Sequence, residues 1–410
     1  MPLAEWKASR LDELGFVGRG KSRHRPRNAP FLYGGPYPFF QTGDIKAANF
    51  HLTEYSQTYS EQGLAQSKLW KPGTLCITIA ANIAESAILG VEGCFPDSVV
   101  GFVADPAKAD VRFIKYYMEI LKLQMQSVSQ GATQDNLSVD KLLSFDFLVP
   151  SLPIQQRIAG ILSAYDELIE NSQRRIRILE SMARTLYREW FVHFRFPGHE
   201  NHPRVPSLLG EIPQGWEVKK LGEIAEEMRR NVPKGDLDEP QPYVGLEHIP
   251  RRSLALDAWE TTTELGSNKL EFKKGEVLFG KIRPYFHKVS VAPFDGLCSA
   301  DTIVVRARRP EHYAFVVACV SSDELVAHAT ATSNGSKMPR ANWGVLEEYG
   351  VVIPKGKVAE QFSALFADTI AQQQALIFQI KNLRRTRDLL LPRLLSGQVD
   401  ISNLPESISA

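Results

Sequence analysis

The sequence predicts a mixed α/β protein in which two pseudo-repeated globular parts are separated by two long antiparallel, coiled-coil-like helices. Three observations predict this fold class. The sequence repeats at an offset of 204 residues, short apolar runs between Gly and Pro punctuation are typical of strands, and two long heptad patterns indicate helices.

The repeat is clearest around two prolines. Pro150 and Pro354 lie 204 residues apart, and each closes an apolar run that precedes a long helical pattern. The same offset relates Asp97 to Asp301. The leading segments EWKASRLDELG and GWEVKKLGEIA also correspond, because each has a Trp, four residues and then a Leu. The chain is therefore predicted to contain two copies of one unit, each with a leading segment, a globular part and a long helix.

Local patterns set the expected boundaries. The runs TLCITIA, SVVGFVA, EVLFGKI and DTIVVRA are rich in Val, Ile and Thr and predict strands, whereas Val111–Gln126 has helical periodicity. Four prolines within FPGHENHPRVPSLLGEIPQG indicate a linker. The expected parts are the first globular domain (1–151), the first long helix (152–195), the linker (196–213), the second globular domain (214–354), the second long helix (355–397) and a C-terminal tail (398–410).

The two long helices share one register. Apolar positions of the first follow a 4-3-4-3 spacing at Ile158, Leu162, Tyr165, Ile169, Ile176, Leu179, Ala183, Leu186 and Trp190. The corresponding positions of the second are Phe362, Phe366, Thr369, Gln373, Ile380, Leu383, Arg387, Leu390 and Leu394. Ser172, Gln373 and Arg387 interrupt the seams. We expect an antiparallel pair about 57 Å long; the alternative is that each helix only covers its own core.

Composition excludes several classes of protein. Apolar residues make up 43% and charged residues 23%, and the net charge is +1, so any nucleic-acid contact needs local basic patches. The four cysteines show no CxxC spacing, which argues against zinc or a disulfide framework and fits a reducing cytoplasm. No apolar run approaches the ~18 residues of a membrane span. The predicted location is cytoplasmic, with no membrane association.

One short motif suggests a nucleotide site. GFVGRGKS, from Gly15 to Ser22, matches the phosphate-binding pattern G-x-x-x-x-G-K-[ST], but that pattern needs a preceding strand and a following helix. Here a polar, helix-like stretch precedes it and two prolines follow closely. A second interpretation is a basic extended arm, whose alternating side chains suit phosphate contacts, namely Lys21, Arg23, Arg25 and Arg27. The remaining alternative is a merely solvated loop. No catalytic or metal-binding residues are predicted.

Polar loops provide the remaining candidates for DNA binding. In the first copy, QTGDI and GATQDNL supply side chains that can read base edges, namely Gln41, Thr42, Asp44, Thr133, Gln134 and Asn136. In the second copy, GKIRPYFHK and GSKMPRAN supply Lys281, Arg283, Tyr285, Lys288, Lys337 and Arg340. Each loop taken alone could equally be an ordinary polar turn. Different side chains on corresponding loops favour two readers of different targets.

These features together resemble a known family. WEVKKLGEIA, GATQDNLS followed by FLVPSLPIQQRI, and LLPRLLSGQVDI are similar to segments of the specificity subunit of Type I restriction-modification systems. The resemblance implies two target recognition domains, each gripping half of a bipartite site in double-stranded DNA, with the helices as a spacer. It also implies a scaffold for two modification subunits, which methylate adenine with S-adenosylmethionine, and two restriction subunits, which use ATP and Mg²⁺. This chain would hold no cofactor and would not be an enzyme.

Three alternatives stay open at this point. The chain could be a P-loop nucleotide-dependent enzyme that uses Gly15–Ser22, or a protein-binding scaffold without DNA contact. It could also be the DNA reader of a system that only methylates and has no restriction subunits.

Overall fold

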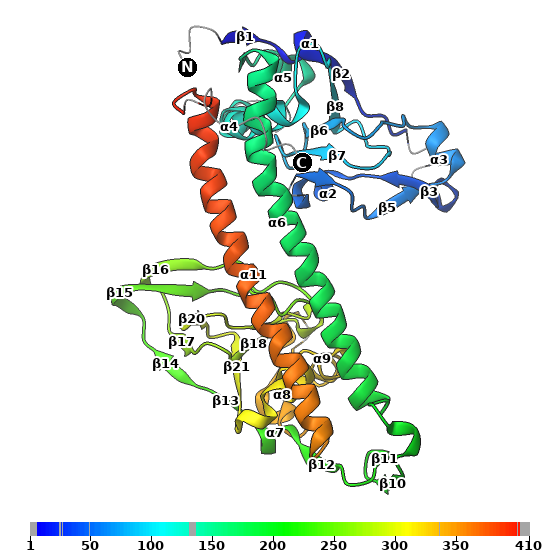
Figure 1. The fold of residues 1–410 in the computed structure, drawn as a ribbon, viewed down its shortest axis with the longest axis vertical. Coiled ribbons are helices and arrows are strands. Elements are labelled where there is room, and N and C mark those ends of the chain that lie inside the picture. Colours follow the sequence, from blue (N-terminus) through cyan, green and yellow to red (C-terminus); the bar gives the residue numbers. More distant parts are fainter. Residues whose placement is uncertain are drawn as a thin grey trace. The chain divides into compact units, whose positions relative to one another are not determined.

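The computed structural model describes residues 6–23, 26, 28–48, 50–130, 137–335, 337–399 and 401 (Figure 1). The chain divides into two compact units. Unit 1 comprises Met1–Glu170 and Asn382–Ala410, and unit 2 comprises Asn171–Lys381. Each long helix therefore contributes one part to each unit.

Unit 1 is built on a five-stranded sheet of order β2-β8-β6-β7-β4. Its neighbours pair antiparallel except for β4 and β7, which are parallel. The strands are β2 (Gly15–Arg19), β8 (Val99–Ala104), β6 (Leu75–Thr78), β7 (Ser86–Leu89) and β4 (His51–Leu52). Two shorter ladders join β3 (Tyr33–Phe39) to β5 (Gln57–Tyr59) and β1 (Lys7–Ser9) to β9 (Phe147–Val149). The helices are α1 (Leu11–Leu14), α2 (Thr42–Ala47), α3 (Glu61–Ala65), α4 (Val111–Gln130) and α5 (Val139–Leu143).

Unit 2 is built on a four-stranded sheet of order β13-β21-β18-β19 and a five-stranded sheet of order β14-β17-β20-β15-β16. The first sheet holds β13 (Ala225–Glu227), β21 (Thr302–Ala307), β18 (Val277–Gly280) and β19 (Val289–Val291). The second holds β14 (Arg230–Val232), β17 (Lys269–Phe272), β20 (Gly296–Ser299), β15 (Gly235–Val244) and β16 (Glu260–Leu265). Further elements are β10 (Arg204–Ser207), β11 (Gly210–Pro213), β12 (Glu217–Lys220), β22 (Gly350–Ile353), α7 (Leu221–Ile224), α8 (Tyr313–Val320), α9 (Asp323–Ala331) and α10 (Trp343–Leu346).

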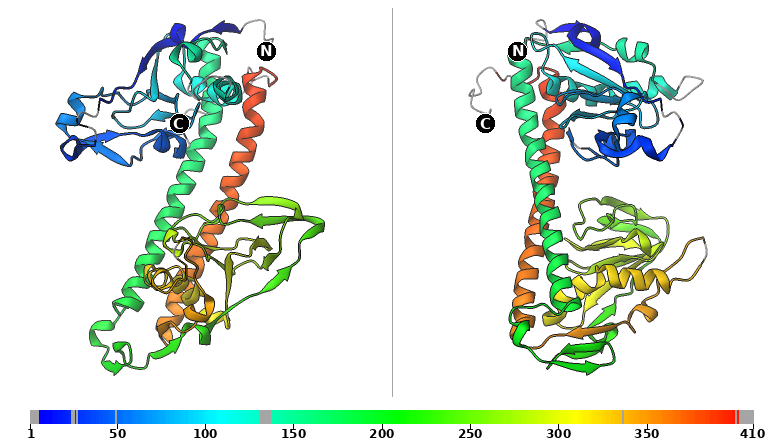
Figure 2. Two further views of the ribbon diagram at one scale, coloured as in Figure 1. Left: turned by 180° about the vertical axis from the view of Figure 1, so that it is seen from behind. Right: turned by 90° about the vertical axis from the view of Figure 1, so that its right-hand side faces the viewer.

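The two long helices are α6 (Leu152–Tyr187), which continues through a π-helical turn at Arg188–Val192, and α11 (Lys357–Leu395). In unit 2 the N-terminal part of α11 runs beside the C-terminal part of α6 (Figure 2). There Phe362 packs edge-on against Phe191, with 4.6 Å between ring centroids. Burial of such aromatic rings stabilises this end of the pair.

The helix contact in unit 1 involves a residue that the heptad pattern presented as an interruption. Arg387 of α11 donates to the carboxylate of Asp166, a residue of α6 whose side chain is only 1% exposed. The seam is therefore not broken at Arg387, because the charged side chain has a buried partner on the facing helix. Gln373, the other interruption on α11, is buried in unit 2, and its side-chain nitrogen has no hydrogen-bond partner in the described part of the chain.

The leading segments close both units in one register. Lys7 of β1 lies opposite Val149 of β9, and Glu217 of β12 lies opposite Ile353 of β22. In each case the strand of the leading segment pairs with the strand that immediately precedes the long helix. Among the described residues no single helix is long and apolar enough to cross a membrane, and Pro310–Val320 with Asp323–Ala331 meet that test only as a pair bent by 63°.

Candidate nucleic-acid interface

In unit 2, two loops join at the end of the central strand β18. Ile282 forms an isolated antiparallel bridge with Arg340, and the backbone N–H of Arg283 donates to the carbonyl of Pro339 at 2.7 Å. Arg283 adopts the left-handed conformation, with φ of 51°, which turns the chain sharply after the strand. This turn places four of the predicted residues, Lys281, Arg283, Tyr285 and Arg340, on two directly bonded loops.

Internal partners orient the charged side chains of these loops. The Lys281 ammonium donates to the carbonyl of Ala300 at 3.1 Å and lies 3.8 Å from the carboxylate of Glu227. The guanidinium of Arg340 lies 3.5 Å from Asp301 and is 56% exposed. Long cationic side chains that are restrained in this way lose less conformational entropy when they bind an anion or a base edge.

The other predicted residues of unit 2 have different surroundings. Lys288 donates to the carbonyl of Leu246, and burial lowers the pKa of its ammonium group. Tyr285 is half exposed and packs edge-on against Phe286, while Lys337 is exposed on the second loop. The structure therefore leaves Arg283, Tyr285, Lys337 and Arg340 exposed to solvent, and uses Lys288 to bridge two segments of unit 2.

Unit 1 has a corresponding pair of loops. The backbone N–H of Leu137 donates to the carbonyl of Ile79 at 2.9 Å, as that of Ala341 does to Lys281 at 2.9 Å in unit 2. The loop after β6 also contains left-handed residues, with φ of 61° at Ala81. Thr133, Gln134 and Asn136, which precede Leu137 in the chain, lie outside the described residues.

Among the predicted residues before and within α2, the polar groups of Gln41 and Asp44 form local hydrogen bonds. The carboxylate of Asp44 accepts from the backbone N–H of Gln41 at 2.7 Å and from the hydroxyl of Ser56 at 3.1 Å. Asp44 therefore stabilises the start of the helix. The Gln41 amide donates to Gln57 at 3.2 Å, and Thr42 is half-buried.

Asn82 is a polar loop residue that the sequence patterns did not indicate. It follows β6, and its side-chain oxygen accepts from the ammonium of Lys46 at 3.2 Å, which connects α2 with the loop after β6. No motif marks this residue, because the contact depends on a separation of 36 positions in the chain.

The basic arm and the phosphate-binding motif overlap in the sequence, and the structure distinguishes them. Gly15–Arg19 forms strand β2, which pairs with β8 along its length, so the P-loop interpretation is wrong because these backbone N–H groups are not arranged in a loop that leads into a helix. Lys21 and Arg23 are exposed, and the hydroxyl of Ser67 donates to the carbonyl of Lys21 at 2.6 Å. Arg25 and Arg27 lie outside the described residues.

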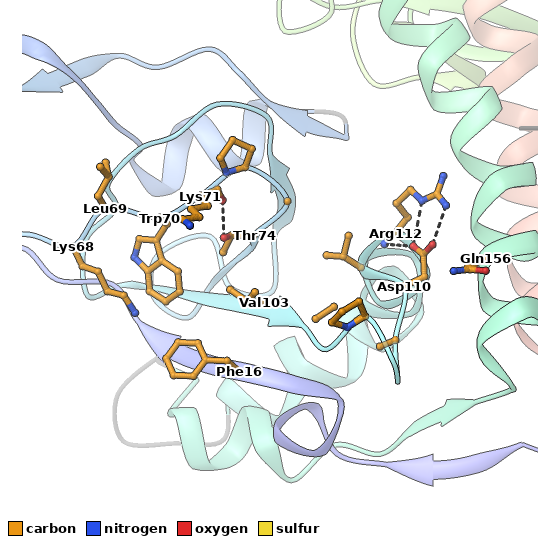
Figure 3. A pocket seen from close by; sticks show the side chains of 16 residues that line it. Phe16, Lys68, Leu69, Trp70, Lys71, Thr74, Val103, Asp110, Arg112 and Gln156 are labelled. Carbon is orange, nitrogen blue, oxygen red and sulfur yellow. Dashed lines mark hydrogen bonds and ion pairs between the residues drawn. The ribbon is translucent and has the colours of Figure 1, made fainter. Parts of the chain in front are cut away.

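A cavity of about 650 Å³ lies in unit 1 between the sheet and the start of α4 (Figure 3). Its aromatic side is formed by Phe16 and Trp70, and the Lys68 ammonium lies 3.6 Å from the Trp70 ring centroid. On its polar side Arg112 and Asp110 pair at 2.9 Å. These charged groups already have partners within the cavity wall. Among the described residues, no group of three or more His, Cys, Asp or Glu side chains could hold a metal ion.

Comparisons with known proteins agree with this geometry. Residues 4–181 match the family model of the Type I restriction modification DNA specificity domain. The MjaIX specificity subunit of Methanocaldococcus jannaschii is 23% identical over 98% of this chain and 95% of its own length. The EcoDI specificity subunit of Escherichia coli is 23% identical over 99% of this chain and 95% of its own.

A solved structure shares the fold. The S subunit of a Type I restriction-modification system from M. genitalium has a TM-score of 0.61 and 15% identity, with coverage of 95% of this chain and 96% of that chain. The resemblance to specificity subunits is therefore confirmed over nearly the whole chain, and residues 4–181 match the model of their DNA specificity domain. Specificity subunits are the non-catalytic members of these systems, whose enzymatic activities reside in the modification and restriction subunits.

Proposed function

We propose that this chain reads a bipartite DNA target, with one half-site bound by the loops of each unit. The observation that carries the proposal is the same hydrogen bond between corresponding loops, Leu137 to Ile79 in unit 1 and Ala341 to Lys281 in unit 2. The same backbone support thus presents different side chains in the two units. This is the arrangement expected of two readers with different targets.

The chemistry of the loops suits base and phosphate contacts. Arg and Lys bond the O6 and N7 atoms of guanine, while Gln and Asn bond the N6 and N7 atoms of adenine in the major groove. Arg283 and Arg340 are exposed in unit 2 and can supply the first kind of contact. Gln41, Gln134 and Asn136 belong to the predicted reading loops of unit 1 and can supply the second. Lys21 and Arg23 suit phosphate contacts.

The proposed domain division keeps the predicted boundaries. Target recognition domains at 1–151 and 214–354 are separated by long helices at 152–195 and 355–397, which form an antiparallel pair that sets the distance between half-sites. Support comes from contacts inside each unit, where Arg387 of α11 meets Asp166 of α6 and Phe362 of α11 meets Phe191 in the π-helical turn that follows α6.

The proposed partners are double-stranded DNA, two modification subunits and two restriction subunits. S-adenosylmethionine, ATP and Mg²⁺ would be bound by those subunits and not by this chain. The similarity to specificity subunits over nearly the full length supports this assignment.

The decisive experiment exchanges one reader. Residues 223–350 are replaced by the matching part of a related specificity subunit, and the methylated target of the assembled complex is sequenced. We expect one half of the target to change and the other to stay. If both halves change together, the model with two independent readers is wrong. A complex that binds no DNA at any salt concentration would instead support a protein-binding scaffold.

A further inference from the structure

The contact between Arg387 and Asp166 is part of a buried triad in unit 1. One carboxylate oxygen of Asp166 accepts from the Arg387 guanidinium, and the other accepts from the hydroxyl of Tyr116 at 2.6 Å. Tyr116 belongs to α4, so the triad joins three different helices. On its outer side Arg387 is also held by Asp388 at 2.8 Å.

The buried carboxylate of Asp166 is fully hydrogen-bonded only when both Tyr116 and Arg387 are present. Burial and the charge of Asp166 raise the pKa of Tyr116 far above its ordinary value, so the hydroxyl keeps its proton and remains a donor. An ion taken out of water is tolerated when its partners satisfy it, and removal of one partner leaves an uncompensated buried charge. Any helix that packs against α6 at Asp166 must therefore supply a partner for this carboxylate.

Unit 2 has apolar residues at the corresponding positions. The offset of 204 residues relates Asp166 to Ile370 and Arg387 to Ala183. Ile370 and Ala183 are 5% and 4% exposed, and both belong to the core of unit 2. The two ends of the helix pair therefore use different chemistry at matched positions.

We propose that this difference makes α6 pair with α11 of the same chain and not with the matching helix of a second copy. The inference rests on the proposed duplication of the unit. If two α6 helices paired in the same antiparallel register, Asp166 of each would face Ala183 of the other. If two α11 helices paired, Arg387 would face Ile370. Every such pairing places the charged side chain opposite an apolar residue, so that the charge loses its ion-pair partner on the facing helix, and penalties of this kind are how similar interfaces discriminate between partners.

A second pair of matched positions adds to this selection. In unit 1, Arg384 of α11 lines a cavity of about 230 Å³ together with the carboxylates of Glu85 and Glu119. The matching residue of α6 is Glu180, which would add a further carboxylate to those of Glu85, Glu119 and Asp166 in that cavity if two α6 helices paired. In unit 2 the same Glu180 accepts from the backbone N–H groups of Leu254 at 2.7 Å and Ala255 at 3.1 Å. The charge at each of these two positions is therefore complementary to the groups that surround it in its own unit.

The test gives unit 1 the chemistry of unit 2. The triple variant Asp166→Ile, Arg387→Ala and Tyr116→Phe keeps an apolar contact within the chain and removes the penalty against pairing with a second copy. Two samples of the full chain with different fluorophores are unfolded in urea, mixed and refolded. Energy transfer and size exclusion with light scattering then measure the mixed dimer. We expect at least about tenfold more mixed dimer than in the wild type.

A rearranged variant provides the complementary test. Arg387→Ala combined with Ala183→Arg keeps the composition but moves the arginine to the position that faces Asp166 in a pair of α6 helices. This variant should form more mixed dimer than the triple variant. Glu167→Gln, at an exposed position next to Asp166, is the control and should behave as the wild type does.

The outcomes are decisive and independent of DNA binding. The proposal is overturned if both variants refold with no more mixed dimer than the wild type. It is also overturned if the triple variant cannot refold, because an apolar contact would then be unable to replace the ion pair. Since the readout is the oligomeric state without DNA, a failure of the DNA-reading function would not affect it.

Discussion

Units 1 and 2 use the same backbone pairings around side chains of different size. Where α11 meets α6 in unit 2, Phe362 packs against Phe191, and the positions 204 residues away are Ile158 and Leu395 in unit 1. All four side chains are buried in the cores of their units. The comparison teaches that matched buried positions can hold aromatic residues in one unit and aliphatic residues in the other.

The units differ most outside the shared strands. The order β2-β8-β6-β7 in unit 1 corresponds to β13-β21-β18-β19 in unit 2, and the parallel pairing of His51 with Ile88 corresponds to an isolated parallel bridge between Ala255 and Val291. Beyond this frame, unit 1 has the two-stranded ladder β3-β5, whereas unit 2 has a complete five-stranded sheet. The two units therefore differ mainly outside the shared strands, which is where two readers of different targets would need different shapes.

The largest effect is expected when both long helices are shortened at once. Deleting Ile169–Arg175 together with Gln373–Gln379 removes one heptad from each helix and shortens the pair by about 10 Å. The preferred distance between half-sites should then shrink by up to about three base pairs, or specific binding should be lost because the grooves no longer face the readers. Binding of targets with varied spacers measures this. Unchanged affinity for the original spacer, in an assembled complex, would contradict the role as a spacer.

The aromatic contact in unit 2 offers the next largest effect. Phe362→Ala should lower the free energy of unfolding of unit 2 by about 3–5 kcal/mol, because it removes a buried ring and leaves a cavity. Urea unfolding followed by hydrogen exchange can resolve the two units. Leu365→Ala, at a position that is 52% exposed on the same helix, should change stability by less than about 0.5 kcal/mol. Ile158→Ala gives the matched change in unit 1, and equal losses in both units would show that the two units unfold together.

A smaller effect is expected for single residues of the reading loops. Arg340→Ala should weaken binding by about 1–3 kcal/mol and relax one position in one half-site if the residue contacts a base. If it contacts phosphate, all sequences should weaken and the salt slope should fall by about 1. Arg309→Ala is the control, because Arg309 is 71% exposed and follows β21 at the end of the sheet away from these loops. Equal effects of both variants would argue against a reading role for these loops.

The smallest effect is a pH dependence confined to unit 1. The hydrogen bond with Glu170 raises the pKa of His51 against the opposing effect of burial. Burial alone would raise the pKa of Glu170, but hydrogen bonds from His51 lower it. Stabilisation by His51 is present below about pH 6.5 and is lost as the pH rises, and that by Glu170 is present above about pH 4.3 and is lost as the pH falls.

This pair should therefore stabilise unit 1 most between those two values, by less than about 1 kcal/mol because both side chains are partly exposed. His51→Gln should flatten the pH profile of unit 1. The matched position in unit 2 is Ala255, so a pH profile of unit 2 that changed with this substitution would contradict the assignment.

The sequence by itself predicted the mixed α/β class, the long helices and several strands of the two sheets. These signals are local, since heptad spacing and short β-branched runs report on the residues that carry them. The predicted helix at Val111–Gln126 became α4, which extends to Gln130. Among the candidate site residues, those of unit 2 lie on two loops that are hydrogen-bonded to each other, and their role in DNA binding stays a prediction.

Only the tertiary structure decided which residues correspond in detail and what the irregular residues do. Asp97 and Asp301 match by the offset of 204, yet the N–H of Ile79 donates to the carbonyl of Ser98 as that of Lys281 does to the carbonyl of Asp301. The structural offset is therefore 202 residues for the donors and 203 for the acceptors. Likewise, the heptad pattern alone presented Arg387 as an interruption, and only the structure shows its partner Asp166, 221 positions away in the chain. Register and charge pairing depend on residues distant in the chain, and the energy of a buried charge is set by its neighbours in space and not by its neighbours in sequence.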